Sequence, residues 1–186
     1  MPSNHAGETG AVYIYKAAKI GWGNKHSYFI EKFEENFRRK FNIKYSIATS
    51  SCTGAIMLAL MSLGVKKGDE VILSDINWIS PASIIKILGA RCIFADINSN
   101  DWCIDPKSIE KKITKKTKVI IATHLYGNTC RMNEIKKIGK KHNIYILEDA
   151  AEAIGSKVKN KYAGTLGEIG VFSFHGTKTI TTGEGG

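Results

Sequence analysis

The chain has 186 residues, a length that supports one sizeable core but not two full domains. Its 43% apolar and 24% charged residues are typical of a globular protein, and no apolar run is long enough for a transmembrane helix, so we expect no membrane partner. The 27 basic and 17 acidic residues give a net charge of +10, but no nucleic-acid-binding motif accompanies the dispersed lysines, which argues against a nucleic-acid partner.

The predicted elements alternate between helices and strands. In chain order, the pattern predicts helices at 28–41 and 53–64, a strand at 70–75, a helix at 79–89, strands at 91–97 and 118–124, a helix at 132–142, and strands at 143–149 and 170–175. Lysine-rich stretches at 107–118 and 136–142 are typical of the solvated faces of short helices. This alternation predicts an α/β fold with a mainly parallel sheet covered by helices on both faces.

Several polar or aromatic side chains follow the predicted strands, namely Asp75 to Trp78, His124, Asp149 and His175. Ligand sites in such sheets gather at the carboxyl ends of the strands, so these positions are candidates for a site. Taken alone, Trp78 is more typical of a core tryptophan. His124 is more typical of a strand-end histidine with satisfied hydrogen bonds than of a catalyst.

The segment IATSSCTGAIMLAL (47–60) places a small polar turn before a predicted helix. Free N–H groups, hydroxyls and the helix dipole at such a turn suit a phosphate. The alternative is that Ser51 and Thr53 only cap the helix. The usual nucleotide motifs are absent: there is no GxGxxG, and GVFSFHGTKT (170–179) does not fit the P-loop spacing.

The segment NIYILEDAAEAIG (143–155) ends a predicted strand with Glu148 and Asp149. A carboxylate at this position could cap a helix, hold a cationic ring nitrogen or bind a metal. No second carboxylate or histidine cluster lies nearby at metal-ligand spacing, so we expect no metal.

Lys178 differs from the other lysines in its surroundings, which are serine, threonine, aromatic and glycine residues rather than charges. One ligand accounts together for a phosphate-binding turn, an aspartate at a strand end and an isolated lysine. The lysine can form a Schiff base with pyridoxal 5′-phosphate, while Asp149 keeps the pyridine nitrogen protonated.

These motifs carry a resemblance to a known family. SFHGTKTITTGEGG, EDAAEAIGS, HLYGN, GDEVILSDINWISPASII and ATSSCTGAIMLAL resemble the DegT/DnrJ/EryC1/StrS sugar aminotransferases, nearest to the perosamine-synthase type. The resemblance implies the large domain of a fold-type-I, pyridoxal-phosphate-dependent transferase. Because the family's lysine lies near mid-chain, it also implies that 21–186 is the N-terminal part of that domain, without the C-terminal small domain.

The resemblance assigns roles around the cofactor ring. Lys178 is the residue that binds the cofactor covalently and moves the proton, and Asp149 pairs with the pyridine nitrogen. Glu152 approaches the phenolic oxygen of the ring, and Trp78 stacks on its face. Lys178 also separates this chain from a branch of the family that carries histidine there and performs deoxygenation.

The resemblance places Thr53, the backbone at Cys52 and the Ser173 hydroxyl around the cofactor phosphate. The family usually has glycine where this chain has Cys52, which bears on how closely the backbone approaches the phosphate. His175 and Glu184 are neighbours on the substrate side without an assigned role.

The implied function is transfer of an amino group from glutamate to a nucleotide-linked 4-keto-6-deoxyhexose, as in GDP-perosamine synthesis for polysaccharide or O-antigen, by a homodimer. The alternative is a truncated, inactive fragment that at most binds phosphate compounds or a partner. In either case we expect a cytoplasmic protein. The N-terminus lacks the layout of a secretion signal, and the cysteines, which lack zinc-site spacing, are expected as reduced thiols (Cys52, Cys92, Cys103 and Cys130).

Residues 1–20 are a segment of uncertain origin. Within them, NHAGETGAVYIY (4–15) resembles the opening segment of the demethoxyubiquinone hydroxylases, in which Glu8 would take the place of a di-iron ligand. No ExxH motif follows in the chain, so the remaining ligands of such a site are missing. The alternative is that AVYIYKAAKIGWG (11–23) is the first helix of the aminotransferase family, running into its Gly-Trp turn.

Overall fold

The computed structural model describes residue 15, residues 18–19 and residues 24–186. The chain divides into two compact units, Met1–Ala48 and Thr49–Gly186. The segment 4–15, apart from Tyr15, lies outside the described residues, and so does its Glu8.

The first unit contains helix α2 (Tyr28–Phe41), whose bounds are those predicted from the sequence. Phe33, Phe37 and Phe41 lie one turn apart and form a row, with ring centroids 5.8 and 4.3 Å apart. The helix ends where Asn42 takes the left-handed conformation (φ 53°) and donates its N–H to the carbonyl of Arg38.

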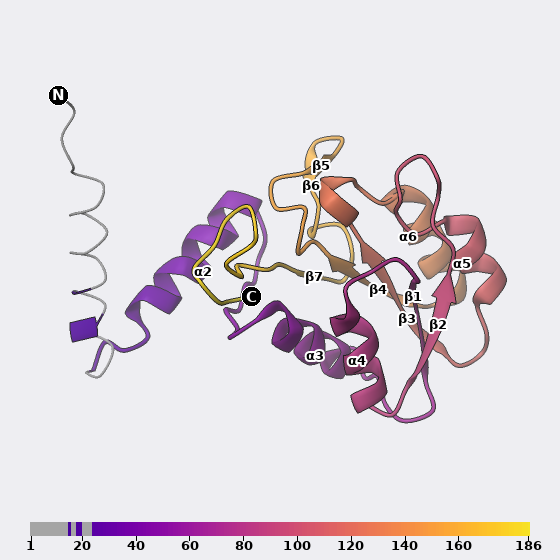
Figure 1. The fold of residues 1–186 in the computed structure, drawn as a ribbon, viewed down its shortest axis with the longest axis horizontal. Coiled ribbons are helices and arrows are strands. Elements are labelled where there is room, and N and C mark those ends of the chain that lie inside the picture. Colours follow the sequence, from indigo (N-terminus) through magenta and orange to yellow (C-terminus); the bar gives the residue numbers. More distant parts are fainter. Residues whose placement is uncertain (1–14, 16–17, 20–23) are drawn as a thin grey trace. The chain divides into compact units, whose positions relative to one another are not determined.

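The second unit is built on a parallel sheet with the strand order β2-β1-β3-β4-β7 (Figure 1). Its strands are β1 (Glu70–Ser74), β2 (Arg91–Ala95), β3 (Thr117–Thr123), β4 (Tyr145–Asp149) and β7 (Ile169–Val171). A small antiparallel hairpin, β5 (Lys157–Val158) and β6 (Lys161–Tyr162), precedes β7. In the register of the two strands nearest the site, Asp149 pairs with Val171.

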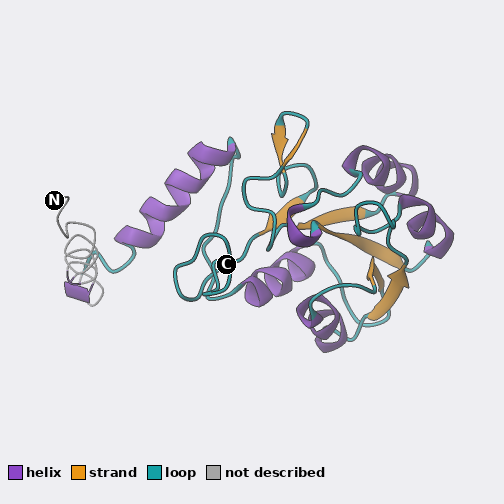
Figure 2. Cartoon of the chain, turned by 45° about the horizontal axis from the view of Figure 1, so that its top comes forward, coloured by secondary structure: helices purple, strands orange, loops and turns teal. Residues whose placement is uncertain are grey.

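Helices cover both faces of the sheet (Figure 2). Helices α3 (Cys52–Ser62) and α4 (Ile79–Ile87) share one apolar core with alternate residues of β1, Val71 and Leu73. Helices α5 (Pro106–Lys112) and α6 (Met132–His142) pack on the other face, where Ile72 points. The alternation of side chains along a buried strand explains why its central residues 71–73 are all apolar, and the predicted two-faced coverage is confirmed.

The sheet has a switch point between β1 and β3. The connection that follows β1 runs through α4 on one face, whereas the connection that follows β3 runs through α6 on the other face. A crevice opens outside the carboxyl ends of such neighbouring strands. The side chain of Asn77, just after β1, donates to the Thr123 hydroxyl at the end of β3 across this point (2.8 Å).

The observed elements differ from the predicted ones mainly at their ends. Strand β4 begins at Tyr145, because Asn143 takes the left-handed conformation (φ 56°) that ends α6. Strand β7 stops at Val171, because the residues after Phe172 leave the sheet to meet the end of the chain. The hairpin β5–β6 was not predicted, because strands of two residues are too short to show an alternation of apolar and polar side chains. No helix of the described residues is both long and apolar enough to cross a membrane.

Candidate active site

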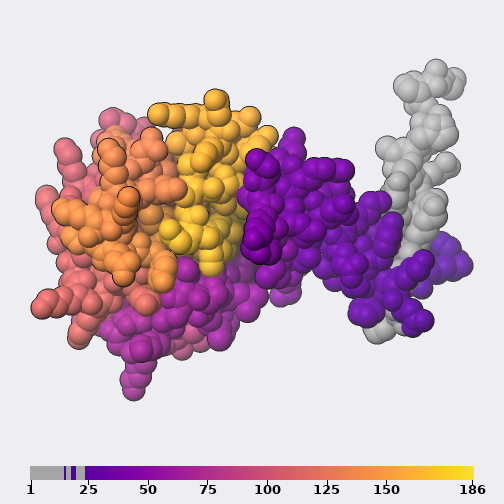
Figure 3. Space-filling model, turned by 180° about the vertical axis from the view of Figure 1, so that it is seen from behind, coloured from indigo at the N-terminus to yellow at the C-terminus, as the bar shows by residue number. Residues whose placement is uncertain are grey.

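The C-terminal segment folds back onto the turn that precedes α3. The N–H of Thr49 donates to the Gly186 carbonyl (2.8 Å), and the N–H of Gly186 donates to the Thr49 carbonyl (3.0 Å). A side chain at Gly186 would meet the backbone of Ser51 and Cys52 at 2.4 to 2.5 Å, so only glycine fits there. In the space-filling view the yellow C-terminal residues lie at the surface beside the orange residues that precede them (Figure 3). The loop that carries Lys178 is thereby brought to the start of that helix.

The start of α3 has the features of an anion site. The Ser51 hydroxyl caps the helix by accepting the N–H of Gly54 (3.1 Å), so the capping interpretation is right for Ser51. It is wrong for Thr53, whose hydroxyl instead shares a hydrogen bond with that of Ser80 (2.9 Å). Within the described residues, the N–H groups of Cys52 and Thr53 have no hydrogen-bond acceptor. Both are therefore open to an anion.

The thiol of Cys52 lies in the same neighbourhood. Burial raises its pKa, the charge of Asp149 raises it further, and the charge of Lys178 opposes them. The electrostatic influence of both residues places Cys52 near Asp149 and Lys178. The thiol stays neutral near pH 7, so Cys52 offers no thiolate nucleophile there.

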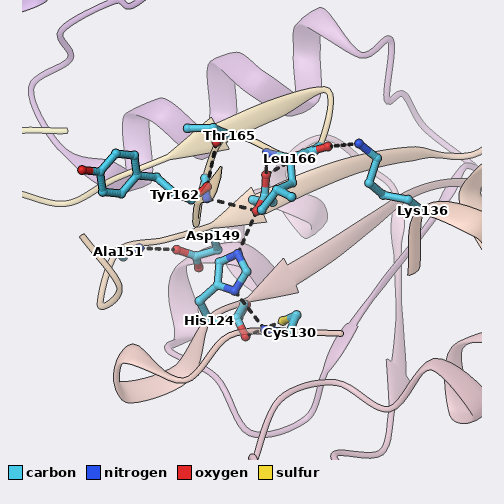
Figure 4. Close-up of polar contacts among 12 residues, drawn as sticks. His124, Cys130, Lys136, Asp149, Ala151, Tyr162, Thr165 and Leu166 are labelled. Atoms are coloured by element: carbon cyan, nitrogen blue, oxygen red, sulfur yellow. Dashed lines mark hydrogen bonds and ion pairs between the residues drawn. The ribbon is translucent and has the colours of Figure 1, made fainter. Parts of the chain in front are cut away.

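Asp149 ends β4 with its side chain 4% exposed. Its Oδ1 accepts the N–H of Ala151 (3.1 Å), and no other group among the described residues donates to the carboxylate (Figure 4). Burial raises the pKa of this carboxyl, partly offset by the Ala151 N–H. No helix begins after Asp149, because 151–156 forms turns, so the helix-capping alternative is wrong. The second oxygen remains available to a hydrogen-bond donor.

Lys178 lies against Glu152. Its Nζ atom is 3.4 Å from Oε1 of Glu152, and both side chains are about one quarter exposed (25% and 28%). Oε2 of Glu152 accepts the N–H of Tyr126 (3.0 Å), a residue held in the left-handed conformation (φ 52°) in the loop after β3. Glu152 thus joins the Lys178 loop to the HLYGN loop.

The remaining candidates differ in exposure. Trp78, directly before α4, is 75% exposed, so its interpretation as a core residue is wrong. Ser173 is buried, and its hydroxyl accepts the N–H of His175 at 3.4 Å. The ring of His175 in turn lies 3.4 Å from Glu184, with both side chains exposed.

His124 is fully buried and has both ring nitrogens satisfied. Its Nδ1 accepts the N–H of Cys130 (3.0 Å), and its Nε2 donates to Glu148 (2.9 Å) (Figure 4). Interpretation of His124 as a satisfied strand-end histidine is therefore confirmed. All four cysteines are free thiols.

The sequence missed Glu148 as a member of the site. It stands beside Asp149 in the EDAAEA motif, but its four donors come from loops far away in the sequence. Ser80 and Tyr126 were also missed as partners of site residues. The HLYGN motif was the one signal that pointed to the Tyr126 loop.

Comparison with known proteins gives consistent matches. Residues 5–186 match the DegT/DnrJ/EryC1/StrS aminotransferase family, and the match includes nearly all of segment 4–15. The chain is 44% identical to the GDP-perosamine synthase of Escherichia coli O157:H7, over 94% of this chain and 48% of that protein. The chain therefore spans about half the length of the curated relatives it matches.

Two solved structures match the fold closely. The aminotransferase from Psychrobacter cryohalolentis has a TM-score of 0.89 and 35% identity, covering 99% of this chain and 47% of that one. The Escherichia coli GDP-4-keto-6-deoxy-D-mannose-3-dehydratase with bound hydrated PLP has a TM-score of 0.82 and 33% identity, covering 92% and 46%.

Proposed function

This chain belongs to the DegT/DnrJ/EryC1/StrS aminotransferase family, and we propose that residues 21–186 form the N-terminal part of the large domain of a nucleotide-sugar aminotransferase. The expected fold class is confirmed, since the solved relatives share this α/β architecture. The observation that carries the proposal is a set of three groups that influence one another electrostatically. They are a lysine held by a carboxylate, a buried aspartate with one open oxygen, and a helix start with open N–H groups.

The cofactor of the family is pyridoxal 5′-phosphate, and the residues present fit it. The open N–H groups of Cys52 and Thr53 suit the phosphate, with Ser173 as a further hydroxyl donor. The open oxygen of Asp149 suits a protonated ring nitrogen, and its buried carboxylate is otherwise poorly compensated. A cation at that nitrogen would stabilise the ionised form of Asp149.

In the proposed mechanism the bound cofactor supplies an electron sink for the carbon that loses its proton. Lys178 would hold the cofactor, and its Nζ would move the proton. Asp149 would keep the ring nitrogen protonated, Glu152 would hold the phenolic oxygen, and Trp78 would cover the ring face. Glu152 also holds Lys178 in position before the cofactor binds.

We propose glutamate as the amino donor and a nucleotide-linked 4-keto-6-deoxyhexose as the acceptor, with a homodimer as the active form in the cytoplasm. The similarity to GDP-perosamine synthases supports a GDP-linked sugar. The dehydratase relative suggests deoxygenation as a second candidate. The family resemblance associates that reaction with histidine in place of the lysine, so Lys178 favours amino transfer.

The test uses the completed chain, by which we mean these residues extended to the length of the relatives. The purified protein is incubated with glutamate and GDP-4-keto-6-deoxymannose, and the products are identified by mass spectrometry. An amino sugar together with 2-oxoglutarate is expected. A 3-deoxy sugar would favour the dehydratase, and no product from a folded, cofactor-loaded dimer would contradict both.

A further inference from the structure

Glu148 is a fully buried carboxylate surrounded by hydrogen-bond donors. Oε2 accepts from His124 Nε2 (2.9 Å) and from the N–H of Gly164 (3.0 Å), while Oε1 accepts the N–H groups of Leu166 and Gly167. Burial alone would raise the pKa of this carboxyl, but the donors outweigh burial and the pKa is lowered. Glu148 is therefore ionised near pH 7, with all of its acceptor sites directed inside the protein.

His124 is fixed in one tautomer by its two partners. The N–H of Cys130 can only donate, so Nδ1 of His124 must be the acceptor and carry no proton. The ring proton then lies on Nε2 and is donated to Glu148. The main-chain N–H of His124 also donates to the Asp149 carbonyl (2.9 Å). Glu148 and His124 thus tie the end of β3 to the end of β4.

The loop at 164–170 reaches Glu148 because glycine occupies each point of close approach. A side chain at Gly164 would lie 2.3 Å from the Phe172 ring, one at Gly167 would lie 2.7 Å from the Ile146 carbonyl, and one at Gly170 would overlap the Gly164 carbonyl. This packing allows three main-chain N–H groups to converge on one carboxylate, as in an anion-binding nest. The loop leads directly into β7, and β7 leads to Ser173 and Lys178.

Glu148 therefore holds both sides of the proposed cofactor site. Asp149 follows it on β4, and Lys178 follows the loop and strand β7 that its carboxylate anchors. Asp149 and Lys178 are proposed to contact opposite ends of the cofactor ring, and the pairing of β4 with β7 sets the distance between them. We infer that Glu148, together with His124, is the positioning unit that fixes Asp149 relative to Lys178. This inference rests on the proposed function, and neither residue contacts the reacting atoms.

The variant Glu148→Gln tests the inference with little change in shape. In one orientation the amide NH₂ of glutamine faces the donors of His124 and Gly164, and in the other it faces those of Leu166 and Gly167. In either orientation two N–H donors lose their acceptor and point at the NH₂ group. His124 cannot switch tautomer to relieve the conflict, because its Nδ1 faces the Cys130 N–H. The variant His124→Phe keeps the Glu148 charge and removes the side-chain hydrogen bond between residue 124 and Glu148.

Glu168→Gln is the matched control. Glu168 lies on the same loop and accepts the N–H of Ile146 (2.6 Å), but it is exposed, and a glutamine oxygen can still accept that N–H. It removes the same formal charge without disturbing the donors around Glu148. Its effect on the cofactor site should be small.

The measurement is made on the completed chain loaded with pyridoxal phosphate. The visible absorption of the cofactor bound to Lys178 is titrated with pH, and the cofactor Kd is measured. Loss of the positioning unit should move the midpoint of the cofactor titration to lower pH by about one unit. The reason is that the protonated, cationic form of the cofactor would no longer have the Asp149 carboxylate in the right place to stabilise it. The cofactor Kd should rise about tenfold in both Glu148→Gln and His124→Phe, whereas Glu168→Gln should match the wild type.

A second measurement needs no variant, because core substitutions can prevent folding. Long-range ¹H–¹⁵N spectra of the wild-type protein should show His124 with its proton on Nε2 and none on Nδ1. The opposite tautomer would overturn the inference. A normal wild-type cofactor spectrum with unchanged variants would overturn this inference alone. A wild type without a cofactor band would overturn the proposed function as well.

Discussion

The Nζ atom of Lys178 lies 3.4 Å from Oε1 of Glu152, whose other oxygen holds the main chain of Tyr126. One carboxylate therefore connects the lysine to the loop that follows β3. A half-buried lysine held in this way is already placed for a reaction before any ligand arrives, and its charge is compensated meanwhile.

Borohydride reduction of the completed chain loaded with pyridoxal phosphate should attach the cofactor to Lys178. The reason is that, among the lysines that the structure describes, Lys178 is the one that is partly buried and influences the Asp149 carboxyl. Peptide mapping by mass spectrometry identifies the modified residue. Label on another lysine, or absence of label from a protein with bound cofactor, would contradict the assignment.

Replacing Asp149 with alanine should reduce amino transfer by about 10²-fold or more while some cofactor remains bound. A neutral ring nitrogen is a poor electron sink, and a positioned charge commonly contributes a few kcal/mol to the transition state. Turnover and cofactor content are measured on the same preparation. Asp75→Ala, an exposed aspartate after β1, is the control, and near-normal turnover in Asp149→Ala would exclude the proposed role.

The cofactor-free completed chain should become more stable near pH 7 when Asp149 is replaced with asparagine. Burial raises the folded-state pKa of Asp149 above its ordinary value of 3.8, so the folded protein binds this proton more readily than the unfolded chain does. The stability that Asp149 contributes therefore falls as the pH rises between the unfolded and folded pKa values and stays low above them.

The advantage of Asp149→Asn should consequently disappear below about pH 4. Urea unfolding at several pH values measures the difference, with Asp75→Asn as the exposed control. An asparagine variant less stable than the wild type at pH 7 would show that the carboxylate is better compensated than its surroundings indicate.

Gly170→Ala should destabilise the protein by about 3 kcal/mol or more, because the new Cβ would overlap the Gly164 carbonyl in the closely packed loop. Gly68→Ala is the control: Gly68 has a positive φ (92°) but open space around it, so only backbone strain of about 1 kcal/mol is expected. Equilibrium unfolding compares the two variants. Equal costs would show that the loop can move aside.

The 186-residue chain expressed alone should aggregate and should not turn over. Phe94 on the edge strand β2 is 49% exposed, and Leu58 and Met61 on α3 are more than half exposed, which favours self-association of uncovered apolar surface. Size-exclusion chromatography and the amino-transfer assay decide the outcome. A monodisperse, active chain would show that the proposed domain boundary is misplaced.

The order and type of the main elements could be predicted from the amino-acid sequence. Their periodicity is local: α2 was predicted with its observed bounds, and the buried strands were recognised by apolar β-branched runs. The sequence also indicated Lys178, Asp149 and the turn before α3 as one chemical set, because few ligands use a lysine, an aspartate and a phosphate site together. The roles of these residues remain predictions.

The surroundings of each residue could be seen only in the folded chain. The exposure of Trp78 and the satisfied ring of His124 depend on neighbours that periodicity does not encode. The pairing of Gly186 with Thr49 and the convergence of the loop at 164–167 on Glu148 join residues that are distant in the sequence. Such contacts form where strands and loops converge in three dimensions, so a buried carboxylate beside Asp149 could be recognised as a structural anchor only from the folded chain.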